Sequence, residues 1–165
     1  MSALSRCNIK WVVKKLIHTG PLNKILEWAC RNGHLDLVKM AIEKGADVKY
    51  KNNAPMFEAC KNGSVEIIKY LLDNGTDKGC DLRCKLIVLE YDRLDATKFL
   101  ISRNISFEYY LHAACLHSSM ELIKFMAEKY GVDGHEPLRA ALKRNRMDVA
   151  KYLLSFEFYD CLRLC

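Results

Sequence analysis

The chain has 165 residues, of which 50% are hydrophobic and 28% charged, and its 26 Lys and Arg against 20 Asp and Glu give a net charge of +6. This composition is typical of a folded soluble protein, and the length fits one domain or one short repeat array. It excludes a disordered chain. No apolar run is long enough to cross a membrane, and the N-terminus lacks the apolar core of a signal peptide. We therefore expect a cytoplasmic protein whose eight cysteines are reduced.

A helical segment recurs along the chain. Its clearest copy follows the turn Asn32-Gly33, begins at Leu35 and stops at Gly45. Four later segments follow the same plan and begin at Val65, Leu94, Met120 and Met147. The intervals between the five starts are 30, 29, 26 and 27 residues. A helix of about ten residues is marginal alone in water and must bury its apolar face on a neighbour, so the pattern predicts a stacked-repeat solenoid.

In chain order, we expect one N-terminal half-repeat, five repeats and an apolar tail within a single array over residues 1–165. Their predicted ranges are 8–20 for the half-repeat, then 23–49, 50–76, 81–104, 107–133 and 134–155 for the repeats, and 156–165 for the tail. In repeat three, residues 86–89 would suit a strand by periodicity, but their place in the repeat predicts a helix whose register can slip by one residue. The tail folds back as a lid, docks on a partner, or is a truncated repeat.

The first-helix and turn segments carry a family resemblance. Residues 55–60, 111–115 and 137–141 resemble the Thr-Pro-Leu-His-x-Ala-Ala motif of ankyrin repeats, and Gly33-His34 and Gly63-Ser64 resemble the turn that follows it. The chain is most similar to the short, degenerate ankyrin proteins of giant DNA viruses. The resemblance implies an all-α solenoid of helix-turn-helix units. Because every interval is shorter than the family period of 33 residues, we expect short hairpin or turn connections with little strand.

Cysteine and histidine residues offer several candidate metal ligands. Three cysteines share one position in the repeat, where the family has a small residue: Cys30, Cys60 and Cys115. We expect these to be buried core thiols. Cys80 with Cys84, and Cys161 with Cys165, have a spacing that could ligate zinc, but neither has a second pair nearby. For His112 the resemblance implies a hydrogen bond that braces the turn. We expect neither a metal nor a cofactor.

Charged residues form one regular column and one cluster. A lysine occupies the same position in every second helix: Lys14, Lys39, Lys69, Lys98, Lys124 and Lys151. An acidic residue lies three positions before each of the last five, which predicts a solvated face with weak pairs of about 0.2–0.5 kcal/mol each. The densest basic cluster contains Arg139, Lys143 and Arg144. It either contacts an acidic protein surface or nucleic acid, or simply gives the array a polar end.

No catalytic motif appears in the chain: there is no Gly-rich phosphate loop, no Gly-x-Ser-x-Gly and no His-Glu-x2-His. We expect a non-enzymatic, monomeric viral module that binds a host or viral protein through its first helices in the host cytoplasm. Two alternatives are a basic nucleic-acid binder and a drifted or truncated viral copy without independent activity. The residues expected to contact the partner are those that packing does not require: Trp28, Arg31, Tyr50, Glu58, Lys61, Tyr109, Leu116, Arg139, Lys143 and Arg144.

Overall fold

The structure, a computed structural model, describes residues 21–76, 81–132 and 135–163, with side chains up to Phe156. Every regular element in these ranges is an α-helix and none is a strand, which confirms the predicted all-α fold. The chain divides into two compact units, Met1–Cys80 and Asp81–Cys165, which we call unit 1 and unit 2. Each unit is described by itself. The predicted half-repeat at residues 8–20 lies outside the described residues.

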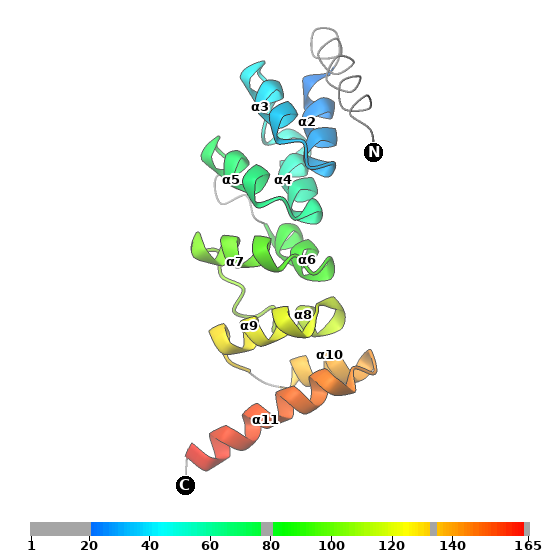
Figure 1. Cartoon of the computed structure of the whole chain (residues 1–165), viewed down its shortest axis with the longest axis vertical. Coiled ribbons are helices and arrows are strands. Elements are labelled where there is room, and N and C mark those ends of the chain that lie inside the picture. Colours follow the sequence, from blue (N-terminus) through cyan, green and yellow to red (C-terminus); the bar gives the residue numbers. More distant parts are fainter. Residues whose placement is uncertain (1–20, 77–80, 133–134, 164–165) are drawn as a thin grey trace, which may run out of the picture. The chain divides into compact units, whose positions relative to one another are not determined.

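Unit 1 contains two repeats, each built from a first helix and a second helix. The four helices are α2 (Leu22–Arg31), α3 (Leu35–Glu43), α4 (Tyr50–Asn62) and α5 (Val65–Asp73). The first helices α2 and α4 pack on each other, and each also packs on the second helix of its own repeat (Figure 1). The core therefore lies between the two layers, as expected for short amphipathic helices that are stable only when stacked.

Unit 2 contains three further helix pairs on the same plan. Its helices are α6 (Leu82–Glu90), α7 (Leu94–Ser102), α8 (Leu111–His117), α9 (Met120–Tyr130), α10 (Glu136–Lys143) and α11 (Met147–Arg163). The first helices form a row in which α8 packs on α6 on one side and on α10 on the other (Figure 1). Residues 86–89 belong to helix α6, so the choice of helix over strand in repeat three is confirmed.

All five second helices begin at the predicted residues, and left-handed residues end most of them. Gly45 (φ 93°) follows α3 and Gly75 (φ 94°) follows α5. Asn104 takes the same role after α7 with φ 62°. Glycine has no steric penalty in this conformation, and Asn tolerates it better than most residues. These residues turn the chain sharply back toward the first helix of the next repeat.

One position of the first helix is fully buried in each of repeats one to four. Cys30, Cys60 and Cys115 are fully buried free thiols, as predicted, and each lies five residues before the start of its second helix. In repeat three that position is Leu89, which is also fully buried. Counted from Leu94, the first helix of repeat three therefore has the register of the other repeats at Leu89. Cys84 itself is fully buried in the core of unit 2.

Consecutive repeats are joined by hydrogen bonds from the turn of one repeat to a carbonyl at the end of the preceding first helix. In unit 1, Asn62 Nδ2 donates to the Arg31 carbonyl at 3.1 Å. In unit 2, Ser118 Oγ donates to Leu89 at 2.7 Å. These donors satisfy carbonyls that have no partner within their own helix. A further donor, Arg146 Nη1, reaches the Cys115 carbonyl at 3.1 Å.

Helix α11 differs from the other second helices in length. It has 17 residues and continues without a break past residue 155, where the sequence predicted that the fifth repeat ends, as far as Arg163. No glycine, asparagine or proline follows Leu154 to stop the helix. The chain therefore neither folds back nor begins a new first helix between residues 156 and 163.

Candidate partner-binding surface

Five of the predicted partner residues lie on the first helices of unit 1. Trp28 and Arg31 belong to α2, whereas Tyr50, Glu58 and Lys61 belong to α4. Arg31 and Trp28 are exposed, and the three residues of α4 are half-buried. The close packing of α2 on α4 brings residues about 30 positions apart in sequence onto one surface.

Arg31 and Glu58 bind each other directly. Arg31 Nε donates to Glu58 Oε2 at 2.9 Å, and Nη2 donates to Oε1 at 3.0 Å. Such a two-point pair is stronger than a single contact and fixes the plane of the guanidinium. The hydrogen bond and charge of Glu58 raise the pKa of Arg31 above its ordinary value. Two residues expected to contact a partner thus join repeat one to repeat two.

The pair belongs to a larger network of alternating charges. Glu27 Oε1 lies 3.3 Å from Arg31 Nη2, and Glu27 Oε2 lies 3.9 Å from Lys51 Nζ. The Lys51 ammonium also lies 5.2 Å from the centre of the Tyr50 ring. Glu58 is held within this network with only 12% of its side chain exposed, whereas Arg31 remains 55% exposed. The unit 1 surface is therefore largely neutralised by its own residues.

Trp28 is the large aromatic residue that unit 1 leaves exposed. Its ring is stacked on His34, with centres 5.3 Å apart and an interplanar angle of 29°. It is 41% exposed, although the neighbouring Leu26, Ala29 and Cys30 are fully buried. The stacking holds one face of the indole and leaves part of the ring available to a partner.

The other five predicted partner residues lie in unit 2. Tyr109 precedes α8 and is 74% exposed, and Leu116 on α8 is half-buried. Arg139 on α10 pairs with the neighbouring Glu136 at 2.8 Å. The side chains of Lys143 and Arg144 are exposed and make no hydrogen bond or ion pair with any part of the chain that the structure describes. Unit 2 therefore leaves two of its cations available.

Repeat three exposes three apolar residues that were not predicted as partner contacts. Leu82 and Leu86 lie on α6 with 57% and 38% exposure, and Tyr91 follows the helix with 40% exposure. The repeat interval would have drawn attention to Leu82, because it lies 27 residues before Tyr109 and the second helices of the two repeats start 26 residues apart. The uncertain register of repeat three concealed this relationship. Together these residues add an apolar area to the first helices of unit 2.

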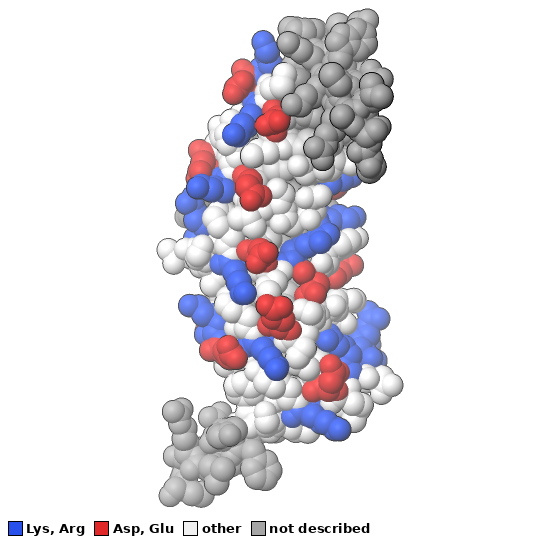
Figure 2. Space-filling view, viewed as in Figure 1, with Lys and Arg blue, Asp and Glu red and all other residues white. Residues whose placement is uncertain are grey.

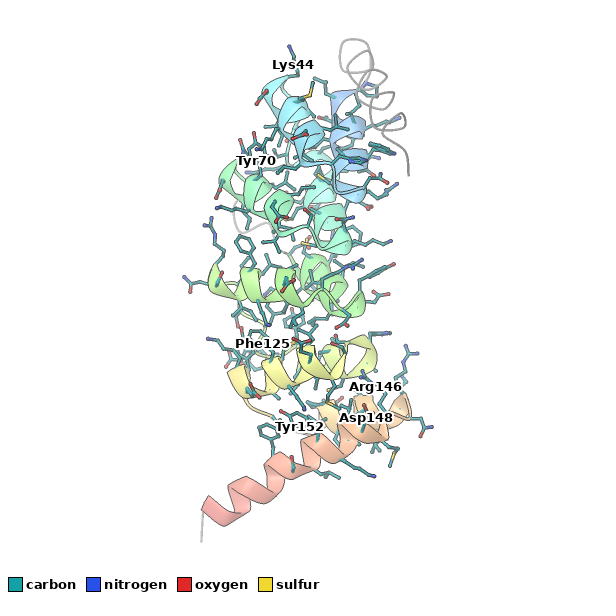
Figure 3. The ribbon with its side chains drawn as sticks, viewed as in Figure 1. Lys44, Tyr70, Phe125, Arg146, Asp148 and Tyr152 are labelled. Carbon is teal, nitrogen blue, oxygen red and sulfur yellow. The ribbon has the colours of Figure 1, made fainter. Side chains whose placement is uncertain are left out.

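The lysine column of the second helices has a contact that the sequence analysis did not foresee. Three lysines extend over an aromatic ring of the next repeat. The distance from Nζ to the ring centre is 5.7 Å for Lys39 over Tyr70, 5.4 Å for Lys98 over Phe125 and 5.6 Å for Lys124 over Tyr152. The three rings are labelled in Figure 3. Basic and acidic side chains are interspersed on the face seen in Figure 2, as predicted for this column. The lysines therefore contribute to packing between repeats through cation–π contacts.

The described residues offer no metal centre, since they contain no group of three or more His, Cys, Asp or Glu that could hold an ion. Burial raises the pKa of Cys30 to about 12, with a smaller effect from Glu58 and Glu27, and burial raises that of Cys115 to about 11. Both thiols are therefore protonated at neutral pH and are poor nucleophiles and ligands. Cys80 and the pair Cys161 and Cys165 lie outside the described side chains.

His112 makes the kind of local contact that the resemblance implied. Its Nδ1 lies 3.0 Å from the backbone carbonyl of Tyr109, which links the start of α8 to the preceding turn. The contact helps to position Tyr109, whose ring is the most exposed large hydrophobic group in the described chain.

No helix among the described residues is long and apolar enough to span a membrane.

Two comparisons relate the chain to known proteins. Residues 1–81 match a family model described as "Ankyrin repeats (3 copies)". The chain is also 28% identical over 160 residues to a protein of Acanthamoeba polyphaga mimivirus named "Putative ankyrin repeat protein R837". That match covers 89% of this chain but 24% of the viral protein, so the chain spans only a minor part of its relative's length.

Proposed function

Because the chain is an ankyrin-repeat protein, we propose that it is a non-enzymatic module that binds a host or viral protein through the surface of its first helices. The main support is the exposure of large apolar side chains on that surface, where the core does not need them. These residues are Trp28, Leu82, Leu86 and Tyr109. Burying such side chains drives most protein association, and aromatic residues commonly dominate the affinity.

The chemistry of the surface favours binding over catalysis. The fully buried thiols of Cys30 and Cys115 have raised pKa values, which removes the best candidate nucleophiles. On the first helices of unit 1, Arg31 is paired with both Glu58 and Glu27. Such pairs stabilise a surface and do not polarise a substrate. A viral origin and a role in the host cytoplasm form part of the proposal, supported by the similarity to the mimivirus protein.

The proposal can be tested by affinity capture from an Acanthamoeba lysate, with bound proteins identified by mass spectrometry. The immobilised wild-type chain would be compared with a Trp28→Ala/Tyr109→Ala variant and with Leu154→Ser, a control that alters an exposed leucine of a second helix. We expect a specific protein to be retained by the wild type and the control but lost from the double variant. Equal retention by all three would place the binding surface elsewhere.

Nuclease treatment of the lysate distinguishes a protein partner from the main alternative, a nucleic-acid partner. A net charge of +6, together with Lys143 and Arg144, which have no partner among the described residues, would also suit a nucleic-acid binder. In that case capture would disappear after nuclease treatment and would fall steeply with added salt, because phosphate contacts release counterions. Retention that survives nuclease and moderate salt would support a protein partner.

A further inference from the structure

We propose that unit 2 binds an acidic peptide segment that has apolar residues at one end. The segment would lie across α6, α8 and α10, with its apolar end on α6 and its acidic end on α10. This inference rests on the proposed function and specifies the chemistry of the partner. It depends on two areas of the unit 2 surface that differ in character and lie on neighbouring helices.

The first area, the apolar area, consists of Leu82, Leu86 and Tyr109. The two leucines are four residues apart on α6 and therefore share one side of the helix. Cys84 and Val88 of the same helix are fully buried, so the leucines are on the side that the core does not use. Tyr109 lies within one residue of the corresponding position of the next repeat, just before α8, and α6 packs directly on α8. Adjacent exposed apolar residues mark an interaction site when they form one patch.

The second area, the basic area, consists of Arg139, Lys143 and Arg144 at α10 and its C-terminal end. Lys143 and Arg144 have no acidic partner within the described structure. Arg139 forms an ion pair with Glu136, and both side chains are highly exposed, at 74% and 70% respectively. A pair this exposed is worth little in water and can be exchanged for a carboxylate of a partner. The basic area therefore offers up to three cations to an acidic segment.

The remaining charges set the orientation of the segment. Glu90 ends α6 and Glu108 precedes Tyr109, and both are exposed near the apolar area. They would repel carboxylates bound there. On the α6 side, Arg83 is paired with Asp81 at 2.9 Å. The acidic end of the segment is therefore expected at α10, where Arg139, Lys143 and Arg144 outnumber the one acidic residue of the helix, Glu136.

A peptide fits these charges better than a nucleic acid does. The cations on the α6 side are already engaged: Arg83 pairs with Asp81, and the Lys85 ammonium lies 5.3 Å from the Tyr110 ring centre and 5.9 Å from that of Phe107. A nucleic-acid strand would need cations along its whole path. In contrast, apolar side chains can fill the α6 end without any charge.

The span of the surface limits the length of the segment. Packed helices lie about 8–10 Å apart, so the distance from α6 across α8 to α10 is roughly 20 Å. An extended chain advances about 3.3 Å per residue, so roughly six residues connect the two areas. A linear segment of about eight to ten residues would therefore contact both of them.

The test is selection from a phage-displayed library of random peptides of about twelve residues, twice the estimated span. We expect enriched sequences to contain apolar residues separated from Asp or Glu by roughly four to six positions. Synthetic, fluorescein-labelled versions would then be titrated by fluorescence anisotropy. A Leu82→Ser/Leu86→Ser variant and a Lys143→Glu/Arg144→Glu variant should each weaken binding by about tenfold or more.

The matched control is Lys44→Glu/Lys129→Glu, which makes the same charge change at two exposed lysines away from the first helices. It should bind the peptides like the wild type, and circular dichroism should show that every variant is folded. The inference is overturned if no sequence is enriched, if enriched peptides lack acidic residues, or if both test variants bind normally. Tight binding of a single-stranded RNA oligonucleotide in place of peptides would also overturn it.

Failure of this inference can be distinguished from failure of the proposed function. A lysate protein that requires Trp28 and Tyr109, found together with a library that yields no acidic sequences, would leave the proposed function intact and reject the acidic segment. The reverse result, acidic peptides without a lysate partner, would support the inference about unit 2. It would show that the lysate lacks the natural partner or contains it at too low a concentration.

Discussion

Unit 1 and unit 2 use the charges of their first helices in different ways. In unit 1, Lys51, Glu27, Arg31 and Glu58 form a continuous network of opposite charges. In unit 2, Lys143 and Arg144 have no acidic partner within the described residues. A charged residue on a binding surface is therefore not by itself a sign of partner contact. Those in unit 1 join neighbouring repeats, whereas those in unit 2 are available to a ligand.

The prediction with the largest expected effect replaces one acidic residue with lysine in each unit. Glu58→Lys should lower the free energy of unfolding by about 2 kcal/mol, because it removes a charged two-point hydrogen bond from a mostly buried position and places a cation beside Arg31. Glu136→Lys should cost less than about 0.5 kcal/mol, because its pair with Arg139 is exposed. Urea unfolding of both variants provides the measurement. Equal losses would contradict the difference between the units.

Helix capping offers a second comparison. The described helices of unit 1 have no N-cap side-chain hydrogen bond, whereas in unit 2 Asp81 accepts from the Cys84 amide at 3.1 Å. Burial acts to raise the pKa of Asp81, but the hydrogen bonds from Cys84 and Arg83 outweigh it and lower the pKa overall. Its stabilisation is therefore complete above the ordinary value of 3.8 and is lost as pH falls through the lower folded-state pKa.

Asp81→Ala should accordingly destabilise unit 2 by about 1 kcal/mol at neutral pH. The difference in melting temperature between variant and wild type should shrink as pH is lowered below 3.8, because protonation of Asp81 removes the charged cap from the wild type. Thermal unfolding at several pH values would measure it. A difference that stays constant across this range would rule out the charged cap as its source.

The residues that end the second helices give a third, smaller comparison. Gly75 in unit 1 and Asn104 in unit 2 have the same left-handed conformation. A Cβ atom built on Gly75 meets nothing within 4 Å, so substitution there tests conformation without a clash. Gly75→Ala should cost about 1 kcal/mol and Gly75→Asn less, because Asn tolerates this conformation. Chemical denaturation of the three proteins should rank them in that order, and a reversed order would refute the explanation.

The smallest expected effect concerns the lysines that cover aromatic rings. Lys39→Gln in unit 1 and Lys98→Gln in unit 2 should each lower stability by about 0.5 kcal/mol, since each removes one exposed cation–π contact. A double-mutant cycle with Tyr70→Leu would isolate the contact of Lys39 from its other effects. A coupling energy of zero would show that Lys39 is only a solvated charge, as the sequence alone suggested.

The repeat plan was predictable because it is local and recurrent. The starts of all five second helices and the burial of Cys30, Cys60 and Cys115 followed from sequence periodicity. Two features were harder to predict from the sequence. The register of repeat three could not be read from its degenerate first helix, and the length of α11 depends on the absence of a residue that would stop it. Neither shows as a change in hydrophobic pattern.

The candidate surface was harder to predict because its contacts join different repeats. The bond between Arg31 and Glu58 spans 27 residues, and periodicity places both on first helices without showing that they meet. The same limit applies to Lys98 over Phe125. Leu82 was missed for another reason. Its place in the repeat becomes evident only after repeat three has been aligned with repeat four. The partner residues proposed from the sequence therefore need the stacked geometry before their roles can be separated.

The hydrogen bonds between consecutive repeats have a consequence for how such a chain can evolve. Asn62, Ser118 and Arg146 are chemically unlike, yet each donates to a carbonyl at the end of the preceding first helix. These donors lie three, two and one residues before the start of their second helices, so the joint between repeats does not require one particular side chain at one fixed position. Copies of the unit can diverge until they share little identity while the joint between them persists. A saturation scan here should accept many amides, hydroxyls and guanidinium groups but few hydrocarbons.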